Sequence, residues 1–214
     1  MLTSNSLALQ LVATLPSGVD GLFNPWADTC PMDLPHNGPE AKIARLAAHL
    51  DTVPRFILCG EAPGYQGCRH SGVAFTSERL LLEGAIPRIN ESMSRLTSRE
   101  LPFSEPSSTI VWKTLYKLGI AESTVMWNAV QLHPHKAGDS STNRTPRSDE
   151  IALGRPAMQL LVGAFPDAKV VAIGKKAHEL LTDMGINVTA SIRHPANGGA
   201  REFEAGLTQV MSQF

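Results

Sequence analysis

The stretch Arg55–Gly64, RFILCGEAPG, joins a short apolar run to a turn that contains two glycines and a proline. The run RFILC (55–59) lacks the alternation of a half-exposed strand, which is typical of a strand covered on both faces in a parallel sheet. In the turn GEAPG (60–64), the glycines let the backbone bend tightly and approach a ligand, and Pro63 stiffens it. The stretch therefore predicts a buried strand that leads into either a ligand-binding loop or a plain strand-to-helix turn.

Elements of the same kind recur along the chain. Three further β-rich runs are Thr124–Trp127, Lys169–Ile173 and Asn187–Ile192. Helical patterns precede and separate the runs, at Glu40–Leu50, Ser77–Glu83, Ser108–Leu118, Thr145–Phe165 and Lys175–Met184. Alternation of strands and helices predicts parallel pairing. We expect an α/β fold, a three-layer α/β/α sandwich with a central four-stranded parallel sheet.

The helix expected at Thr145–Phe165 carries its own start signal. Thr145 supplies a capping hydroxyl, Pro146 suits the first helical position, and acidic residues follow in the first turn. Pro156 is expected to kink or restart this helix.

The length of 214 residues fits one domain, and an apolar fraction of 43% suffices for a sizeable core. We expect residues 1–214 to form a single domain, in which residues 1–36 are an N-terminal helix and a wrapping arm. With 19 Lys and Arg against 20 Asp and Glu, the net charge of −1 argues neither for nor against a nucleic-acid partner.

Cysteine content and hydropathy indicate in which cellular compartment the protein is expected. Three cysteines cannot pair completely, and no basic segment precedes the apolar stretch Leu7–Leu15 as it would in a secretion signal. No apolar run approaches the ~18–20 residues of a membrane span. We therefore expect a cytoplasmic protein without a membrane partner.

Ligands of an open parallel sheet bind beyond the carboxyl ends of the strands. This rule selects the segments that follow the predicted strands: Gly60–Gly64, Asn128–His133, Gly174–Lys175 and His194–Gly199. We expect these four turns to converge on one cavity.

Two of the turns carry side chains suited to a nucleobase. The amide of Asn128 accepts one hydrogen bond and donates another, which matches the N3–H and O4 edge of uracil or thymine. A turn-capping asparagine is the alternative. His194-Pro195 fixes an imidazole on a rigid turn, although a single histidine is more often structural than catalytic.

Taken together, the segments resemble the uracil-DNA glycosylase superfamily over about residues 55–205. The resemblance is carried by GEAPG (60–64), Gly-x-x-Phe (72–75), NAVQLHP (128–134), NRTP (143–146), AIGKKA (172–177) and HPANGG (194–199). GEAPG and NRTP are most similar to the branch that carries an iron–sulphur cluster.

The resemblance implies a role for each segment. The loop residues Gly60, Ala62, Pro63 and Gly64 would line the catalytic pocket. Phe75 would stack on the everted base, with an ordinary core aromatic as the alternative. Asn128 would recognise uracil, and His194 would hold the base at O2 and stabilise the departing anion.

The residue that orients the hydrolytic water is harder to place. Superfamily members often have Asp at the position of Ala62, and the iron–sulphur branch has a carboxylate at the position of Gly67. Glu61 is therefore the catalytic candidate for this step, beside His194. No lysine is marked as a Schiff-base nucleophile.

Contacts to DNA phosphates are expected at the helix that starts near Lys175 and around the last loop, from Lys175, Lys176, Arg193, Asn197 and Arg201. The cations Lys136, Arg144 and Arg147 extend this strip. The loop 196–199 offers no bulky wedge for the space that an everted base leaves, and Arg201 is the candidate for it.

The cysteines do not match those of the iron–sulphur branch. Cys30, Cys59 and Cys68 are too few for a cluster held by four cysteines. We expect neither a metal, a metal cluster nor another cofactor.

The sequence thus predicts a monomeric, monofunctional glycosylase that hydrolyses the N-glycosidic bond of uracil in DNA. Two alternatives stay open: a DNA-binding relative that has lost hydrolysis, which Ala62 and Gly67 suggest, and a glycosylase for another deaminated base such as hypoxanthine.

Overall fold

The computed structural model describes residues 3–89 and 94–214. Its centre is a four-stranded sheet of order β3-β2-β5-β6 in which each neighbouring pair is parallel. The strands are β2 (Phe56–Gly60), β3 (Thr124–Asn128), β5 (Lys169–Ile173) and β6 (Ala190–Ile192). The predicted four-stranded parallel sheet is confirmed.

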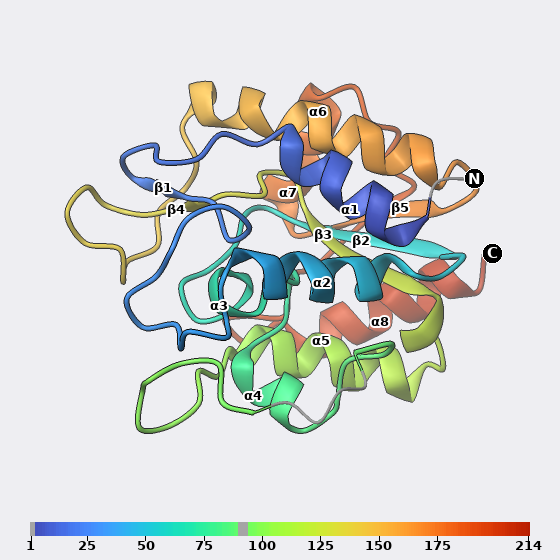
Figure 1. Cartoon of the computed structure of the whole chain (residues 1–214). Helices are drawn as coiled ribbons and strands as arrows, with labels where there is room; N and C mark the ends of the chain where they lie inside the picture. The colour runs from blue at the N-terminus through green and yellow to red at the C-terminus, as the bar shows by residue number, and fades with distance from the viewer. Residues whose placement is uncertain (1–2, 90–93) are drawn as a thin grey trace.

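Helices cover both faces of the sheet (Figure 1). They are α1 (Ser4–Ala13), α2 (Pro39–Leu50), α3 (Cys68–Ser71), α4 (Glu78–Leu82), α5 (Pro106–Lys117), α6 (Ser148–Ala164), α7 (Lys175–Asp183) and α8 (Ala200–Met211). One face packs against α1, α2, α6 and α7. The other packs against α4, α5 and α8. The three-layer α/β/α sandwich is therefore confirmed.

The sequence of strand β2 does not alternate between polar and apolar residues because both faces of the strand are buried. Ile57 and Cys59 face the core under α2 and α6, whereas Phe56 and Leu58 face the core under α5 and α8. All four side chains are fully buried. Each large apolar side chain buried in this way contributes about 1.5–3 kcal/mol to folding. A polar residue at any of these positions would lose that contribution.

The start of α6 corrects the expected cap. The helix begins at Ser148, not near Thr145, because the Glu150 carboxylate accepts a hydrogen bond from the Arg147 N–H at 2.8 Å and caps the first turn there. The helix also does not restart at Pro156, which lies inside it.

Helix α8 has no counterpart among the predicted elements. Its residues Phe203, Leu207 and Val210 are buried against the sheet at helical spacing. The helix starts directly after the last candidate loop, so it fixes where that loop ends.

The arm that follows α1 crosses the body of the protein. The Trp26 ring stacks on that of Trp127, with centroids 6.0 Å apart, and its indole N–H donates to the Gly72 carbonyl at 3.0 Å. Before Trp26 in the arm, the short strand β1 (Leu22–Phe23) pairs antiparallel with β4 (His133–Pro134). The arm thereby supports the ends of β3 and of the Gly-x-x-Phe segment.

No helix within the described residues is long and apolar enough to cross a membrane.

Candidate active site

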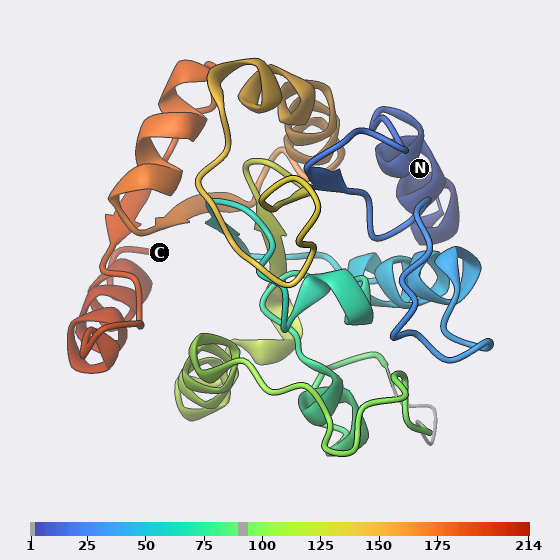
Figure 2. The same cartoon turned by 90° about the vertical axis from the view of Figure 1, so that its left-hand side faces the viewer.

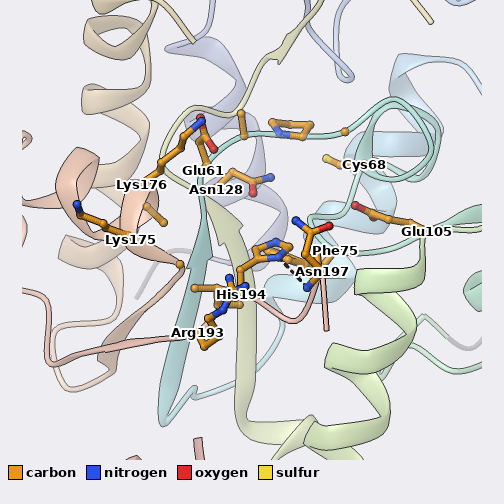
Figure 3. A pocket seen from close by; sticks show the side chains of 17 residues that line it. Glu61, Cys68, Phe75, Glu105, Asn128, Lys175, Lys176, Arg193, His194 and Asn197 are labelled. Carbon is orange, nitrogen blue, oxygen red and sulfur yellow. Dashed lines mark hydrogen bonds and ion pairs between the residues drawn. The ribbon is translucent and has the colours of Figure 1, made fainter. Parts of the chain in front are cut away.

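The carboxyl ends of the strands open on one side of the molecule, which faces the viewer in Figure 2. A cavity of about 480 Å³ lies there. Its walls include residues from all four of the predicted turns, together with Cys68, Phe75 and Glu105 (Figure 3). A neighbouring hollow of about 360 Å³ shares Glu61–Gly64, Glu105 and His194 with it. The four turns expected to converge therefore do so.

Asn128 ends β3 with its side chain in the cavity wall. The residue is 4% exposed, yet its side-chain amide makes no hydrogen bond to any described residue. The Gln131 amide caps the following turn instead, donating to the Asn128 carbonyl at 2.7 Å. Asn128 is thus not a turn-capping residue, and its buried amide keeps a donor and an acceptor for a ligand.

Gly60 makes room for this amide. A Cβ on Gly60 would lie 2.6 Å from the Phe75 ring and 2.8 Å from Asn128 Oδ1, closer than real Cβ atoms approach. Glycine at this position lets an aromatic ring and an amide meet across the end of β2. Gly60 itself lies behind the cavity surface, which Ala62, Pro63 and Gly64 line.

Phe75 belongs to the hydrophobic core and also lines the cavity. It is 8% exposed and belongs to the core under α5, while its ring lines the cavity. Its backbone has a φ of 51°, which is uncommon for a bulky residue, and the Trp112 indole donates to its carbonyl at 2.9 Å. Strained backbone of this kind is often found at functional sites.

His194 presents one ring nitrogen to the cavity. Its Nδ1 accepts a hydrogen bond from the Ala196 N–H at 3.1 Å, so the neutral ring carries its hydrogen on Nε2. Burial, followed by the charge of Arg193, lowers the pKa of His194 below its ordinary value. The imidazole is therefore a neutral hydrogen-bond donor at pH 7. Its ring centroid lies 6.1 Å from that of Phe75.

Glu61 and Lys176 line the cavity together. The Lys176 ammonium is 3.6 Å from Glu61 Oε1 and donates to the Thr145 hydroxyl at 2.7 Å. Lys176 is therefore held by these two groups. Lys175, by contrast, is 89% exposed and pairs weakly with Glu179, four residues further along α7.

The other candidate DNA contacts divide into two groups. Arg193 and Asn197 are exposed and line the cavity rim. Arg201 is exposed in the first turn of α8 and is not among the cavity residues. The structure thus places two of these three side chains at the opening.

Arg144, which is expected to extend the phosphate-binding strip, is held in structural contacts and also lines the smaller hollow. Its guanidinium forms two hydrogen bonds of 2.7 Å with the Glu150 carboxylate and also donates to the Gly21 carbonyl. Arg147 pairs with the same carboxylate at 2.8 Å. Both cations are engaged in holding the start of α6.

Glu105 is a cavity residue that the sequence did not single out. It immediately precedes α5 and lines both hollows. In sequence, an acid before Pro106 and two serines is typical of an ordinary helix start, so no local signal marks it.

Possible metal ligands gather away from this cavity. Within the described part of the chain, Cys30, Asp33 and His70 place ligand atoms within 4.8 Å of one another. Asp33 already accepts from the Lys42 ammonium at 2.6 Å and pairs with His70 Nδ1 at 2.8 Å. A cation there would compete with that ammonium, so the cluster fits a salt-bridged network better than a metal site.

The cysteines do not fit an iron–sulphur cluster. Cys30, Cys59 and Cys68 are free and buried. Within the described residues, Cys59 and Cys68 do not belong to the group of possible metal ligands whose atoms lie within 4.8 Å of one another, which contains only Cys30 of the three.

A buried cavity with an aromatic wall, a free amide and a neutral imidazole donor suits a flat ring with a hydrogen-bonding edge, as in enzymes that act on nucleobases. Comparison with known proteins defines this class further. Residues 48–210 match the family described as the uracil DNA glycosylase superfamily. The chain belongs to this superfamily and is a DNA glycosylase.

Among solved structures, the fold is similar to that of wild-type SMUG2 from Pedobacter heparinus. The TM-score is 0.64 at 16% sequence identity, over 100% of this chain and 98% of the other. No curated protein sequence gives a significant match.

Proposed function

We propose that the protein is a monofunctional uracil-DNA glycosylase, which hydrolyses the bond between uracil and deoxyribose and leaves an abasic site. The observation that carries this proposal is the buried, unpartnered amide of Asn128 in a cavity wall. The amide oxygen and nitrogen still reach the cavity, so a ligand with the complementary edge takes the place of water there and forms both hydrogen bonds. The N3–H and O4 of uracil form such an edge.

The remaining walls suit a base that has left the duplex. Extrusion of a base costs a few kcal/mol, and a pocket that stacks and hydrogen-bonds the base compensates for it. The Phe75 ring lines the cavity, and stacking on an aromatic ring is worth ~1–3 kcal/mol per base. A uracil mispaired with guanine is easier to extrude and is the expected preferred substrate.

His194 supports the chemical step. Cleavage of the N-glycosidic bond leaves negative charge on the departing uracil, and its O2 is a natural site for that charge. The Nε2–H of a neutral imidazole is a donor that needs no rearrangement as the charge develops. One preorganised donor of this kind is worth ~2.7–4 kcal/mol of barrier lowering.

Contacts to the DNA backbone would come from the rim. Lys175 and Arg193 are exposed cations beside the opening, and Asn197 lies in the exposed loop between His194 and α8. These groups would position the duplex without reading its sequence.

A second candidate substrate is hypoxanthine. It presents an N–H donor beside a carbonyl acceptor, which is the pattern that the Asn128 amide satisfies. The cavity of about 480 Å³ is also in the size range of sites that bind small molecules.

A base-release panel tests the proposal. Duplexes with U·G, U·A or hypoxanthine·T pairs and a single-stranded uracil oligonucleotide are incubated with excess protein, and abasic sites are cleaved with alkali. We expect release from U·G to be fastest. Release of hypoxanthine but not uracil would favour the second substrate. Binding of the uracil DNA without release of any base would favour the non-catalytic alternative.

A further inference from the structure

Glu105 reaches the cavity from a different side than the predicted loops. It lies before α5, and its carboxylate points inward from the wall opposite Lys175 and Lys176 (Figure 3). The hydroxyls of Ser107 and Ser108 donate to it, the former at 3.4 Å. Among the described residues no Lys, Arg or His lies within ion-pair distance of this carboxylate. A carboxylate held by two hydroxyls alone retains acceptor capacity for another donor.

The Glu105 carboxylate occupies space that a side chain at position 67 would fill. A Cβ on Gly67 would overlap Glu105 Oε2, at a distance that real Cβ atoms do not reach. The absence of a side chain at 67 therefore lets the acid that precedes α5 approach the GEAPG loop. This close approach is a feature of the tertiary structure, since the two residues are far apart in sequence.

Hydrolysis requires a group that orients water toward the sugar, and two acids line the cavity. Glu61 forms an ion pair of 3.6 Å with the Lys176 ammonium, without a hydrogen bond to it. Ala62 and Gly67 supply no polar side chain. Glu105 is the cavity acid without a cationic neighbour, and it faces both hollows.

We propose that Glu105 is the catalytic carboxylate that binds the hydrolytic water and accepts its proton. This inference rests on the proposed glycosylase activity. In the reaction, the bond between C1′ and N1 breaks and its electron pair leaves with uracil. The water oxygen bonds to C1′, and the proton that it loses passes to the Glu105 carboxylate. Uracil N1 is protonated from solvent on release.

The electrostatics agree with this role. Burial raises the pKa of Glu105, and the hydrogen bonds from Ser108 and Ser107 oppose that effect without cancelling it. A proton acceptor works best when its pKa lies near the working pH, so a raised carboxyl pKa favours general-base action near neutrality.

Single-turnover release of uracil from a U·G duplex tests the assignment in three variants: Glu105→Gln, Glu61→Gln and Glu100→Gln. Glu100 is an exposed acid in the same loop, so its variant controls for the lost charge. Glu105→Gln is expected to reduce the rate constant by about 10²–10⁴-fold, the range of general-base catalysis. Glu100→Gln should leave the rate within about twofold of the parent, and Glu61→Gln should cost less than Glu105→Gln.

Binding and folding are measured on the same proteins. The Kd for a duplex that carries 2′-fluoro-deoxyuridine, and the thermal midpoint, should match the parent in Glu105→Gln. If that variant fails to fold, Glu105→Asp serves instead and is expected to retain more activity than Glu105→Ala. A rate for Glu105→Gln equal to that of Glu100→Gln, or a loss fully explained by weaker binding, would overturn the inference. Failure of the parent protein to release uracil would instead reject the proposed function.

Discussion

The Ala196 N–H donates to Nδ1 of His194 at 3.1 Å, two residues away on the same loop. This local bond determines which ring nitrogen of His194 carries hydrogen and points it away from the loop. Because burial lowers the pKa of the imidazole, the neutral form persists at pH 7. The loop thus prepares a hydrogen-bond donor before any DNA binds.

A first prediction concerns the state of this ring. Nitrogen-15 NMR of histidine-labelled protein should show His194 neutral at pH 7 with its hydrogen on Nε2, and it should titrate below the ordinary value for histidine. The exposed His36 serves as an internal reference. A charged ring at pH 7, or hydrogen on Nδ1, would remove the basis for the donor role.

Removing either group that faces the base should slow excision. Truncating Asn128 to Ala deletes both hydrogen bonds to the base edge, a loss of about 1–3 kcal/mol, or roughly 10–100-fold. His194→Ala should cost about 10²–10³-fold, as for other preorganised donors. Single-turnover uracil release measures both, with His36→Ala as the control. Near-parental rates in both variants are incompatible with the proposed site.

A third prediction exploits the chemistry of the amide. In Asn128→Asp a carboxylate repels O4 of uracil, so uracil excision should fall. When protonated, the same group can accept from the cytosine N4 amine and donate to N3, so weak release of cytosine should appear at low pH. Mass spectrometry of the released bases measures both activities. Unchanged uracil release by this variant would mean that Asn128 does not contact the base edge.

Gly60→Ala should damage the site through crowding. The new methyl group would press on the Phe75 ring and on Asn128 Oδ1, which must shift at a cost of about 1–3 kcal/mol. Gly163→Ala is the matched control, because a Cβ there meets no atom within 4 Å. Urea unfolding and uracil release together should show losses in Gly60→Ala and none in Gly163→Ala. Equal behaviour of the two would contradict the packing described here.

Acid should destabilise the protein before its carboxylates titrate. Burial, with smaller contributions from nearby arginines, lowers the pKa of His49 to about 3 and that of His133 to about 4. In the unfolded chain both titrate near 6.5. Below pH 6.5 the unfolded state therefore binds protons that the folded state does not, and stability is lost as the pH falls.

For each of these histidines, the free energy of unfolding should fall by up to about 1.4 kcal/mol per pH unit between pH 6.5 and about 4. Urea unfolding at pH 7.5, 6 and 5 measures it. A free energy of unfolding that stays constant over this range would show that these two rings are not held neutral in the folded protein.

The strands could be predicted because their apolar runs are local and continuous. Lys169–Ile173 has the same bounds in sequence and structure, and the other three runs overlap β2, β3 and β6. The rule that ligands gather at the ends of parallel strands then placed Asn128 and His194 near the cavity. Neither inference needed long-range contacts.

The errors come from interactions between distant or competing groups. Thr145 resembles a helix cap, but the Glu150 carboxylate fixes the start of α6 three residues later. Arg144 resembles a free cation because its partner Glu150 is recognisable only in the folded chain. Glu105 reaches the cavity because Gly67 leaves space for it. Such contacts are not visible in one sequence.

If this cavity holds an everted uracil, a crystal structure of the protein with a U·G duplex that contains 2′-fluoro-deoxyuridine will show the base there. We expect uracil inside the cavity, with the Asn128 amide on N3 and O4, the Phe75 ring against its face and His194 Nε2 at O2. A uracil that remains stacked in the duplex, or that lies outside the cavity with Asn128 still unpartnered, would contradict it.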